Sequence, residues 1–335
     1  MTFEEILLLR LDRQHLLSPA PPLKVAGDTC GLQAQYLTHA LHALFLRSGC
    51  CDTSGMVKTW ATRGTMHLIA EKDLPLFLHR DRTRFLRNVD TLESDGTVSA
   101  RRKQYFADLI LDAAGCGTVT REALKELCSR NGMTEQEETS LFDPWGGLIR
   151  ALCENGKLCH VITQEKAYRL CPPFEPMAAE AARLELTRRY FTHFGPATIR
   201  DAAYFFGTTR KAVERCLQKL PVSETEFNGK AFFHISQEAS SPCTVPTCLF
   251  LAGFDPFLLG YDKKESLTLP PEDSRSIFTL SGIVRPAILL HGQVVGWWHL
   301  KNRRLTATCF RPCDQNLIRS AAEELWPELR GIIFE

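Results

Sequence analysis

Hydrophobic residues in the first part of the chain form two helix-like stripes followed by a β-prone segment. One stripe covers residues 6–17 and ends at a proline-rich break, and the other covers residues 37–45 and ends near Gly49. Residues 57–69 are rich in β-formers and contain a glycine at which the chain can turn. Helix, helix and hairpin in this order indicate a winged helix over residues 1–95.

The same order of elements recurs twice. The second copy, residues 96–175, is expected to have helices over 102–114, 120–127 and 137–152, and strands over 156–161 and 167–170. In the third copy, residues 176–240, a helix from Ala178 is followed by two helices that meet at Gly207, which is a helix-turn-helix signature. One such pair is as often a packing unit as a DNA reader, but three in series favour DNA binding.

The pattern changes beyond Ser241. Four strands are expected, over residues 245–250, 283–290, 294–299 and 305–310, with a closing helix over 314–329. Gly292 lies at a hairpin tip between two of these strands. The predicted fold class is therefore α+β, with three tandem winged-helix units and a β-rich C-terminal domain over 241–335.

Composition fits a globular protein without a membrane span or metal. Of the 335 residues 44% are hydrophobic and 24% charged, and no apolar run approaches the roughly 18 residues of a transmembrane helix. The acidic, amphipathic start is unlike a signal peptide, so we expect a cytoplasmic protein. The 13 cysteines are scattered without paired CxxC spacing, which indicates reduced thiols and no metal site.

Positive charge is local rather than global. The chain has 40 basic and 39 acidic residues, and the basic ones cluster at 79–87, 101–103, 188–189, 210–211 and 301–304. Any single cluster is compatible with a solvated helix face. Several clusters beside helix-turn-helix patterns favour a surface that follows DNA phosphates. Arg210 and Lys211 begin the third unit's expected recognition helix and are predicted to contact DNA.

Five segments, in order, resemble the AlkZ-like family of winged-helix DNA glycosylases, to which YcaQ is related. They are residues 31–35, 60–68, 190–198, 254–261 and 282–297. The first contains Gln33 and Gln35 and resembles the Gln-x-Gln motif of the AlkZ branch, whereas the YcaQ branch has Asp at the second position. Tyr36 follows where relatives often have Asp. The resemblance implies that the winged helices and the β-rich domain form a concave DNA-binding surface.

The resemblance also implies a monofunctional DNA glycosylase that cuts N7-alkylated purines from DNA and leaves an abasic site. Some members act on interstrand crosslinks. No cofactor is implied, and the partner is double-stranded DNA carrying alkylated purines; we expect a monomer associated with the bacterial nucleoid. The alternative is a non-enzymatic winged-helix regulator, which would favour a dimerisation helix or a ligand-sensing domain. No obvious segment of either kind, and no P-loop or G-x-S-x-G motif, is present.

Gln33 and Gln35 are the predicted catalytic residues. Hydrolysis of an N-glycosidic bond passes through a cationic sugar, and an N7-alkylated purine needs no general acid because it already carries positive charge. Two amide oxygens can position a water and stabilise that sugar. We expect residues 33–35 to be extended or loop-like, so that both side chains share an exposed face. The alternative is that both are ordinary polar linker residues.

Further DNA contacts are predicted at two other places. Arg63, Thr65 and His67 occupy alternate positions and would face one way on a strand, toward a phosphate or the lesion pocket. The alternatives are a solvent-facing wing, or for His67 a core position. His291 and Gln293 flank the hairpin glycine and are also predicted to contact DNA.

Overall fold

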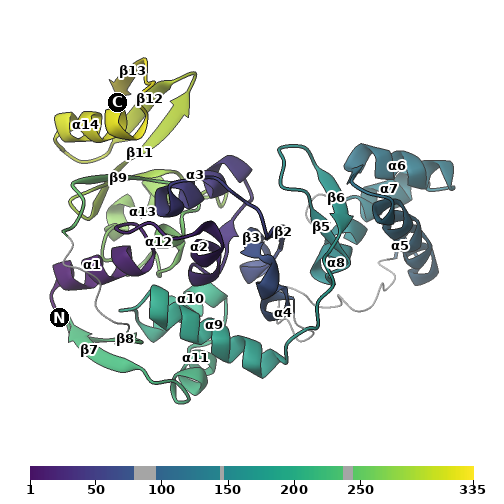
Figure 1. Cartoon of the computed structure of the whole chain (residues 1–335), viewed down its shortest axis with the longest axis horizontal. Coiled ribbons are helices and arrows are strands. Elements are labelled where there is room, and N and C mark those ends of the chain that lie inside the picture. Colours follow the sequence, from purple (N-terminus) through teal and green to yellow (C-terminus); the bar gives the residue numbers. More distant parts are fainter. Residues whose placement is uncertain (79–95, 144–146, 237–243) are drawn as a thin grey trace. The chain divides into compact units, whose positions relative to one another are not determined.

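The computed structural model describes all residues except 79–95, 144–146 and 237–243. The chain divides into two compact units, of which the first combines Met1–Asp52 with Thr187–Glu335 and the second is Thr53–Leu186 (Figure 1). The basic segment 79–87 lies outside the described residues. In the part of the chain that is described, no helix is long and apolar enough to cross a membrane.

The first unit begins with short helices around the segment that contains Gln33. These elements are α1 (Phe3–Arg13), α2 (Pro22–Asp28), β1 (Leu32–Gln33) and α3 (Leu37–Ser48). A capping box at Thr2 starts α1. The expected extension of α1 to residue 17 is wrong, because His15 adopts a left-handed conformation at φ 60° that ends the helix. The end of α3 is confirmed, with Gly49 at φ 72°.

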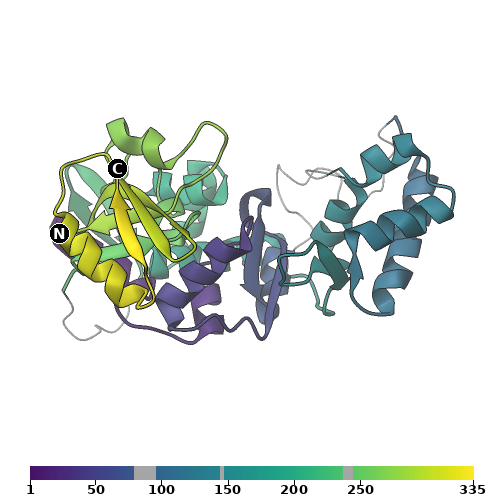
Figure 2. The same ribbon diagram turned by 90° about the horizontal axis from the view of Figure 1, so that it is seen from above.

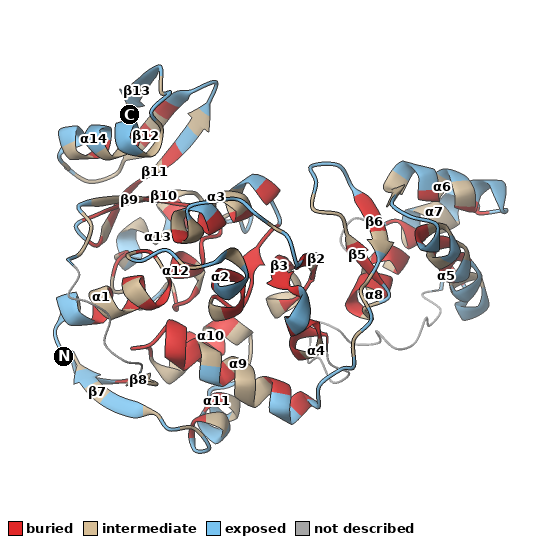
Figure 3. Cartoon of the chain, in the orientation of Figure 1, coloured by how far each residue is buried: buried red, intermediate tan, exposed pale blue. Residues whose placement is uncertain are grey.

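The helix-turn-helix predicted in the third copy is present. It consists of α10 (Ile199–Phe206) and α11 (Arg210–Leu217), which follow α9 (Ala179–His193). A capping box at Thr198 starts α10, Gly207 ends it at φ 62°, and Thr209 caps α11. Figure 3 shows α10 more buried than α11. A hairpin that the sequence analysis missed follows, with strands β7 (Ser223–Phe227) and β8 (Lys230–His234).

A five-stranded sheet forms the C-terminal part of the first unit. Its strands are β9 (Cys248–Leu251), β10 (Ala287–Leu290), β11 (Gln293–Lys301), β12 (Arg304–Cys309) and β13 (Gly331–Phe334), in the order β13-β12-β11-β10-β9. The short helices α12 (Pro256–Leu259) and α13 (Ser274–Ile277) precede β10, and α14 (Gln315–Leu325) precedes β13. The predicted strands and closing helix are confirmed, with bounds shifted by a few residues.

Both faces of this sheet are covered by hydrophobic residues. Along β10, Ala287 and Leu289 belong to a core shared with Leu7 of α1, whereas Ile288 belongs to a core shared with Ile318 of α14. Figure 2 shows α14 beside the strands. Because successive strand residues point to opposite faces, a fully apolar β10 identifies a strand covered on both sides.

The second unit is also mixed α and β. Its elements are β2 (Met56–Trp60), β3 (Met66–Ala70), α4 (Leu74–Phe77), α5 (Ala100–Gly115), β4 (Val119–Thr120), α6 (Arg121–Arg130), α7 (Glu135–Leu141), α8 (Gly147–Glu154), β5 (Leu158–His160) and β6 (Ala167–Leu170). The single helix expected over 137–152 is wrong. Residue Asp143 precedes a proline, which disfavours helix there, and Gly147 lies at φ 69°.

The four domains predicted from the sequence stay a prediction, because the two compact units of the structure do not test boundaries between winged helices. Within the second unit the strands run in the order β3-β2-β5-β6-β4, and Lys58 of β2 pairs with His160 of β5. The hairpins assigned to the first and second winged helices therefore share one sheet. The predicted boundaries near 95 and 240 fall at residues outside the described ranges. An α+β fold class is confirmed, while the division into three winged helices stays a prediction.

A buried ion pair joins α3 to the loop that follows β9. Arg47 donates from Nη2 to Oδ1 of Asp255 at 2.6 Å and from Nη1 to Oδ2 at 3.2 Å, and both side chains are fully buried. Asp255 also accepts hydrogen bonds from the backbone N–H groups of Ala252 and Phe257. The pair fixes the end of the helix whose start carries the glutamine segment.

Substitution Asp255→Asn should lower the free energy of unfolding by about 3–5 kcal/mol, because it leaves the buried Arg47 guanidinium without a counter-charge. Asparagine retains the ability to cap α12, so the loss reports mainly on charge. The matched control is Glu328→Gln, which breaks an exposed pair with Arg303 and should cost roughly 0–1 kcal/mol. Urea denaturation of the two variants measures both values, and equal losses would contradict the prediction.

Candidate active site

The two glutamines of the motif lie on an extended lead-in to α3. Gln33 is the last residue of β1, and Tyr36, the N-cap residue of α3, is extended at φ −118° and ψ 113°. The buried residues Leu32 and Ala34 alternate with the two glutamines. The expectation of an extended or loop-like segment is therefore confirmed.

The two amides differ in exposure. Gln35 is exposed, as predicted, but Gln33 is buried with 9% of its surface exposed. The expectation that both side chains are exposed is wrong for Gln33, which lies between the buried residues Leu32 and Ala34 rather than in a free linker. A buried amide has a restricted orientation, so Gln33 is positioned before any substrate arrives.

Aromatic contacts hold the first turns of α3 against the loop after β9. Tyr36 stacks on Phe254 with ring centroids 5.9 Å apart, and it contacts His39 edge-on at the same centroid distance. A Cβ atom on Gly253 would lie 2.8 Å from the His39 ring, so only glycine permits this approach. Burial lowers the pKa of His39, and neighbouring His42 lowers it further. Both effects favour the neutral form of the imidazole next to the motif.

Tyr36 is a residue that the sequence analysis did not count as functional. Its side chain is 48% exposed although one ring face packs on Phe254. It directly follows Gln35, so the motif ends in an exposed aromatic ring. The sequence does contain an indication of such a role, because Tyr36 stands at a position where the resemblance leads us to expect aspartate.

The predicted face of Arg63, Thr65 and His67 is not a continuous strand face. Strands β2 and β3 are separated by a 3₁₀ turn over Thr62–Gly64, in which Arg63 has φ 57°. Arg63 and Thr65 are half-exposed, whereas His67 is only 3% exposed. His67 Nδ1 donates to the Thr65 carbonyl. The alternative of a core histidine is therefore favoured for His67.

Arg210 and Lys211 are where the sequence placed them. Both are exposed in the first turn of α11, immediately after the N-cap residue Thr209. The opposite side of the helix buries Val213 and Leu217. The exposed start of α11 can therefore contact an anionic partner while its other side packs.

The hairpin tip between β10 and β11 is confirmed. Leu290 pairs with Gln293, which leaves His291 and Gly292 as the turn, both with positive φ. His291 is exposed, but the Gln293 amide donates to the Leu267 carbonyl at 3.3 Å. A Cβ atom on Gly292 would meet Leu7 of α1 at 2.1 Å, so this side of the tip is packed.

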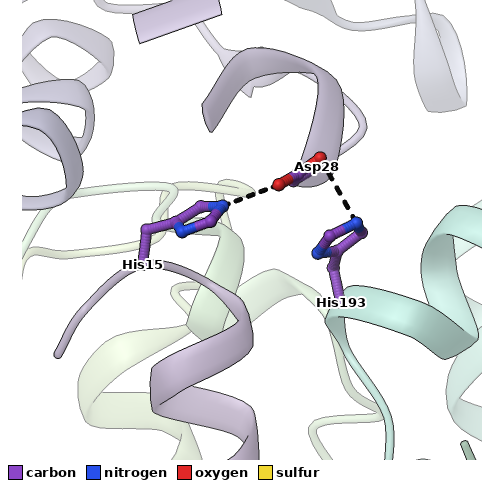
Figure 4. A group of neighbouring side chains, drawn as sticks. All are labelled: His15, Asp28 and His193. Carbon is purple, nitrogen blue, oxygen red and sulfur yellow. Dashed lines mark hydrogen bonds and ion pairs between the residues drawn. The ribbon is translucent and has the colours of Figure 1, made fainter. Parts of the chain in front are cut away.

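Among the described residues, one group of side chains has the composition and spacing to hold a metal ion. It consists of His15, Asp28 and His193, which come from the ends of α1, α2 and α9 (Figure 4). The sequence predicts no metal site, because its cysteines lack paired CxxC spacing and no histidine pair has the spacing of a zinc motif.

The comparisons with known proteins agree on one family. A family model described as DNA glycosylase AlkZ-like matches residues 26–326. A Streptomyces sahachiroi protein named interstrand DNA cross-link repair glycosylase is 23% identical over 352 aligned residues, which cover 96% of this chain and 94% of the relative. The solved structure of Streptomyces sahachiroi DNA glycosylase AlkZ matches with a TM-score of 0.78 at 21% identity and covers 100% of both chains.

Proposed function

Since the chain belongs to the AlkZ-like family of DNA glycosylases, we propose that it hydrolyses the N-glycosidic bond of N7-alkylated purines in double-stranded DNA and leaves an abasic site. Family membership makes the chain a DNA N-glycosylase and decides against the regulator considered above. The proposal concerns the lesion and the residues. The observation that carries it is the preorganised Gln33–Gln35 segment, held in place by α3.

The chemistry suits neutral side chains. Alkylation at N7 gives the purine a positive charge, so the base leaves without a proton from the enzyme. The remaining tasks are to hold the attacking water and to stabilise the oxocarbenium-like sugar. We assign the fixed, buried amide of Gln33 to orienting the water and the exposed amide of Gln35 to contacting the sugar.

Tyr36 extends this site toward the base. Its exposed ring adjoins Gln35 and is backed by Phe254 and His39, which limit its rotation. A cationic alkylated purine stacks favourably on an aromatic face. We therefore assign Tyr36 to binding the lesion base.

DNA binding is assigned to a concave surface built by the winged helices. The order α9, α10, α11 and the β7–β8 hairpin is that of a winged helix, with Arg210 and Lys211 at the start of the second helix-turn-helix element. Arg63, Thr65 and His291 are proposed as further phosphate contacts because the first two are partly exposed and His291 is exposed. We propose that the enzyme acts as a monomer in the bacterial cytoplasm, at the nucleoid.

Interstrand crosslinks are a second substrate to consider. One relative, 23% identical to this chain, is named for crosslink repair and aligns over 94% of its own length. We propose that this chain can also unhook crosslinks formed through N7 of purines, since the leaving group has the same charge.

Gln33→Ala and Gln35→Ala should each slow single-turnover release of N7-methylguanine by roughly a hundred- to thousand-fold, the effect of losing one preorganised polar group, or about 2.7–4 kcal/mol. DNA affinity should stay near normal. Gln35→Asp should retain measurable release, because it creates the motif of the YcaQ branch and adds a negative charge facing the sugar cation.

Gln315→Ala is the matched control, since Gln315 is an exposed glutamine on α14. It should leave release unchanged. Gln33→Ala also needs a thermal denaturation measurement because Gln33 is buried. Normal release rates in both alanine variants of the motif would show that the chemistry lies elsewhere.

Tyr36→Ala should weaken binding of lesion-containing DNA by roughly 5- to 150-fold, equivalent to about 1–3 kcal/mol of base stacking. Tyr36→Phe keeps the ring and should behave like the wild type. The comparison requires the affinity for matched duplexes with and without N7-methylguanine. If both variants lose affinity equally, or if neither does, stacking on this ring is not part of recognition.

Reversing the charges of Arg210 and Lys211 to Glu should weaken binding on every DNA sequence tested, because the proposed contacts are to phosphates. The slope of log affinity against log salt should fall by about 2, roughly 1 per lost contact. Release from saturating DNA should continue at the wild-type rate. A loss confined to one DNA sequence would point to base reading by α11 instead.

A further inference from the structure

We propose that His15, Asp28 and His193 form a binding site for one divalent transition-metal ion, for which zinc is the best match. The site joins the ends of α1, α2 and α9 (Figure 4). It lies outside the proposed catalytic segment, although Asp28 precedes β1 by only a few residues. The inference does not depend on the proposed reaction.

The distances between the ligand atoms fit a shared ion. Nε2 of His15 lies 2.7 Å from Oδ2 of Asp28, and Nε2 of His193 lies 3.2 Å from Oδ1. All the ligand atoms lie within 4.8 Å of one another. Ligands about 2 Å from a tetrahedral zinc ion are roughly 3.3 Å apart. Small side-chain movements therefore bring all three onto one ion.

The hydrogen bonding of His193 points to a cation between the ring and Asp28. Nδ1 of His193 lies 3.2 Å from the Arg13 carbonyl oxygen. A carbonyl can only accept, so Nδ1 carries the proton, and in the neutral ring Nε2 presents a lone pair. That lone pair faces a carboxylate oxygen at 3.2 Å, an arrangement that is favourable only when a proton or a metal ion lies between the two acceptors.

The same contact is the usual support of a metal-bound histidine. Metal-ligating imidazoles commonly donate their other N–H to a backbone carbonyl, which fixes the ring orientation. The side chains of His15, Asp28 and His193 are 12%, 16% and 8% exposed, so the site is partly shielded from solvent while a water can still reach it. Three protein ligands and one water are a common zinc coordination.

Lys24 supplies a positive charge next to Asp28, as a bound metal ion would. Its ammonium group lies 2.7 Å from Oδ2 of Asp28, and its side chain is 54% exposed. A flexible, mostly exposed lysine can turn into solvent when an ion binds. Metal and Lys24 therefore compete for Asp28, which gives the proposal a test that does not remove a ligand.

Imidazole nitrogen and carboxylate oxygen favour zinc among the available divalent ions. Calcium and magnesium prefer oxygen ligands, and copper(I) prefers sulfur. The three ligands are at positions 15, 28 and 193. Because they are far apart in the sequence, no short sequence motif identifies the site. This amends the expectation of no metal site.

The test is a titration of chelator-treated full-length protein with Co²⁺ and then Zn²⁺ at neutral pH. One Co²⁺ per chain should give visible d–d absorption without the near-ultraviolet thiolate band that cysteine ligands would produce, and Zn²⁺ should displace it. Zn²⁺ should also raise the thermal unfolding temperature of the wild type.

Variants separate a metal site from an ion-pair network. Asp28→Asn and His193→Ala should each bind Co²⁺ more than roughly 100-fold more weakly, beyond the 10- to 100-fold effect of outer-shell changes. Lys24→Met, at an exposed position, should bind several-fold more tightly because it removes the competing ammonium. The proposal is overturned if Zn²⁺ leaves the wild-type unfolding temperature unchanged, if the cobalt spectrum shows thiolate ligands, or if Lys24→Met does not tighten binding.

Discussion

The buried pair between Arg47 and Asp255 determines where the segment with Gln33 and Gln35 lies. Two charges buried away from solvent are costly unless they pair with each other, and here the carboxylate also accepts hydrogen bonds from two backbone N–H groups. Few alternative positions of α3 satisfy that requirement, so the helix is held against the loop after β9. The aromatic contacts of Tyr36 and His39 then set its first turns. The position of Gln33 and Gln35 therefore depends on a contact more than 200 residues away in sequence.

Several segments that carry the family resemblance serve packing rather than chemistry. Tyr261 accepts a hydrogen bond from Gln14 and donates to the Phe194 carbonyl, while the Arg10 guanidinium lies 3.8 Å from the centre of its ring. Tyr190 donates to the Gly260 carbonyl at 2.6 Å. Burial raises the pKa of both tyrosines, so both remain neutral donors. These segments join the N-terminal helices to α9 and to the loop before β10.

Local signals in the sequence predicted local structure well. The helix expected over 120–127 and the turn expected at Gly207 located α6, α10 and α11 correctly. The β7–β8 hairpin was not predicted, although an Asn-Gly pair such as Asn228-Gly229 is typical of a hairpin turn. Burial of Gln33, pairing of Arg47 with Asp255 and the meeting of His15 with His193 depend on contacts between distant segments. Spacing within a single sequence does not reveal such contacts, so the glutamine pair could be proposed from the sequence while its surroundings could not.

The unequal burial of the two glutamines gives a physical reason for the difference between the two family branches. An aspartate in place of the buried Gln33 would lose hydration, and its pKa would rise, so it would tend to be protonated and uncharged. At the exposed position of Gln35, an aspartate keeps its hydration and its negative charge. Only the second position can therefore exchange amide for carboxylate without a large desolvation cost, and it is the second position that is Asp in the YcaQ branch. Burial therefore favours a polar but uncharged side chain at the position of Gln33.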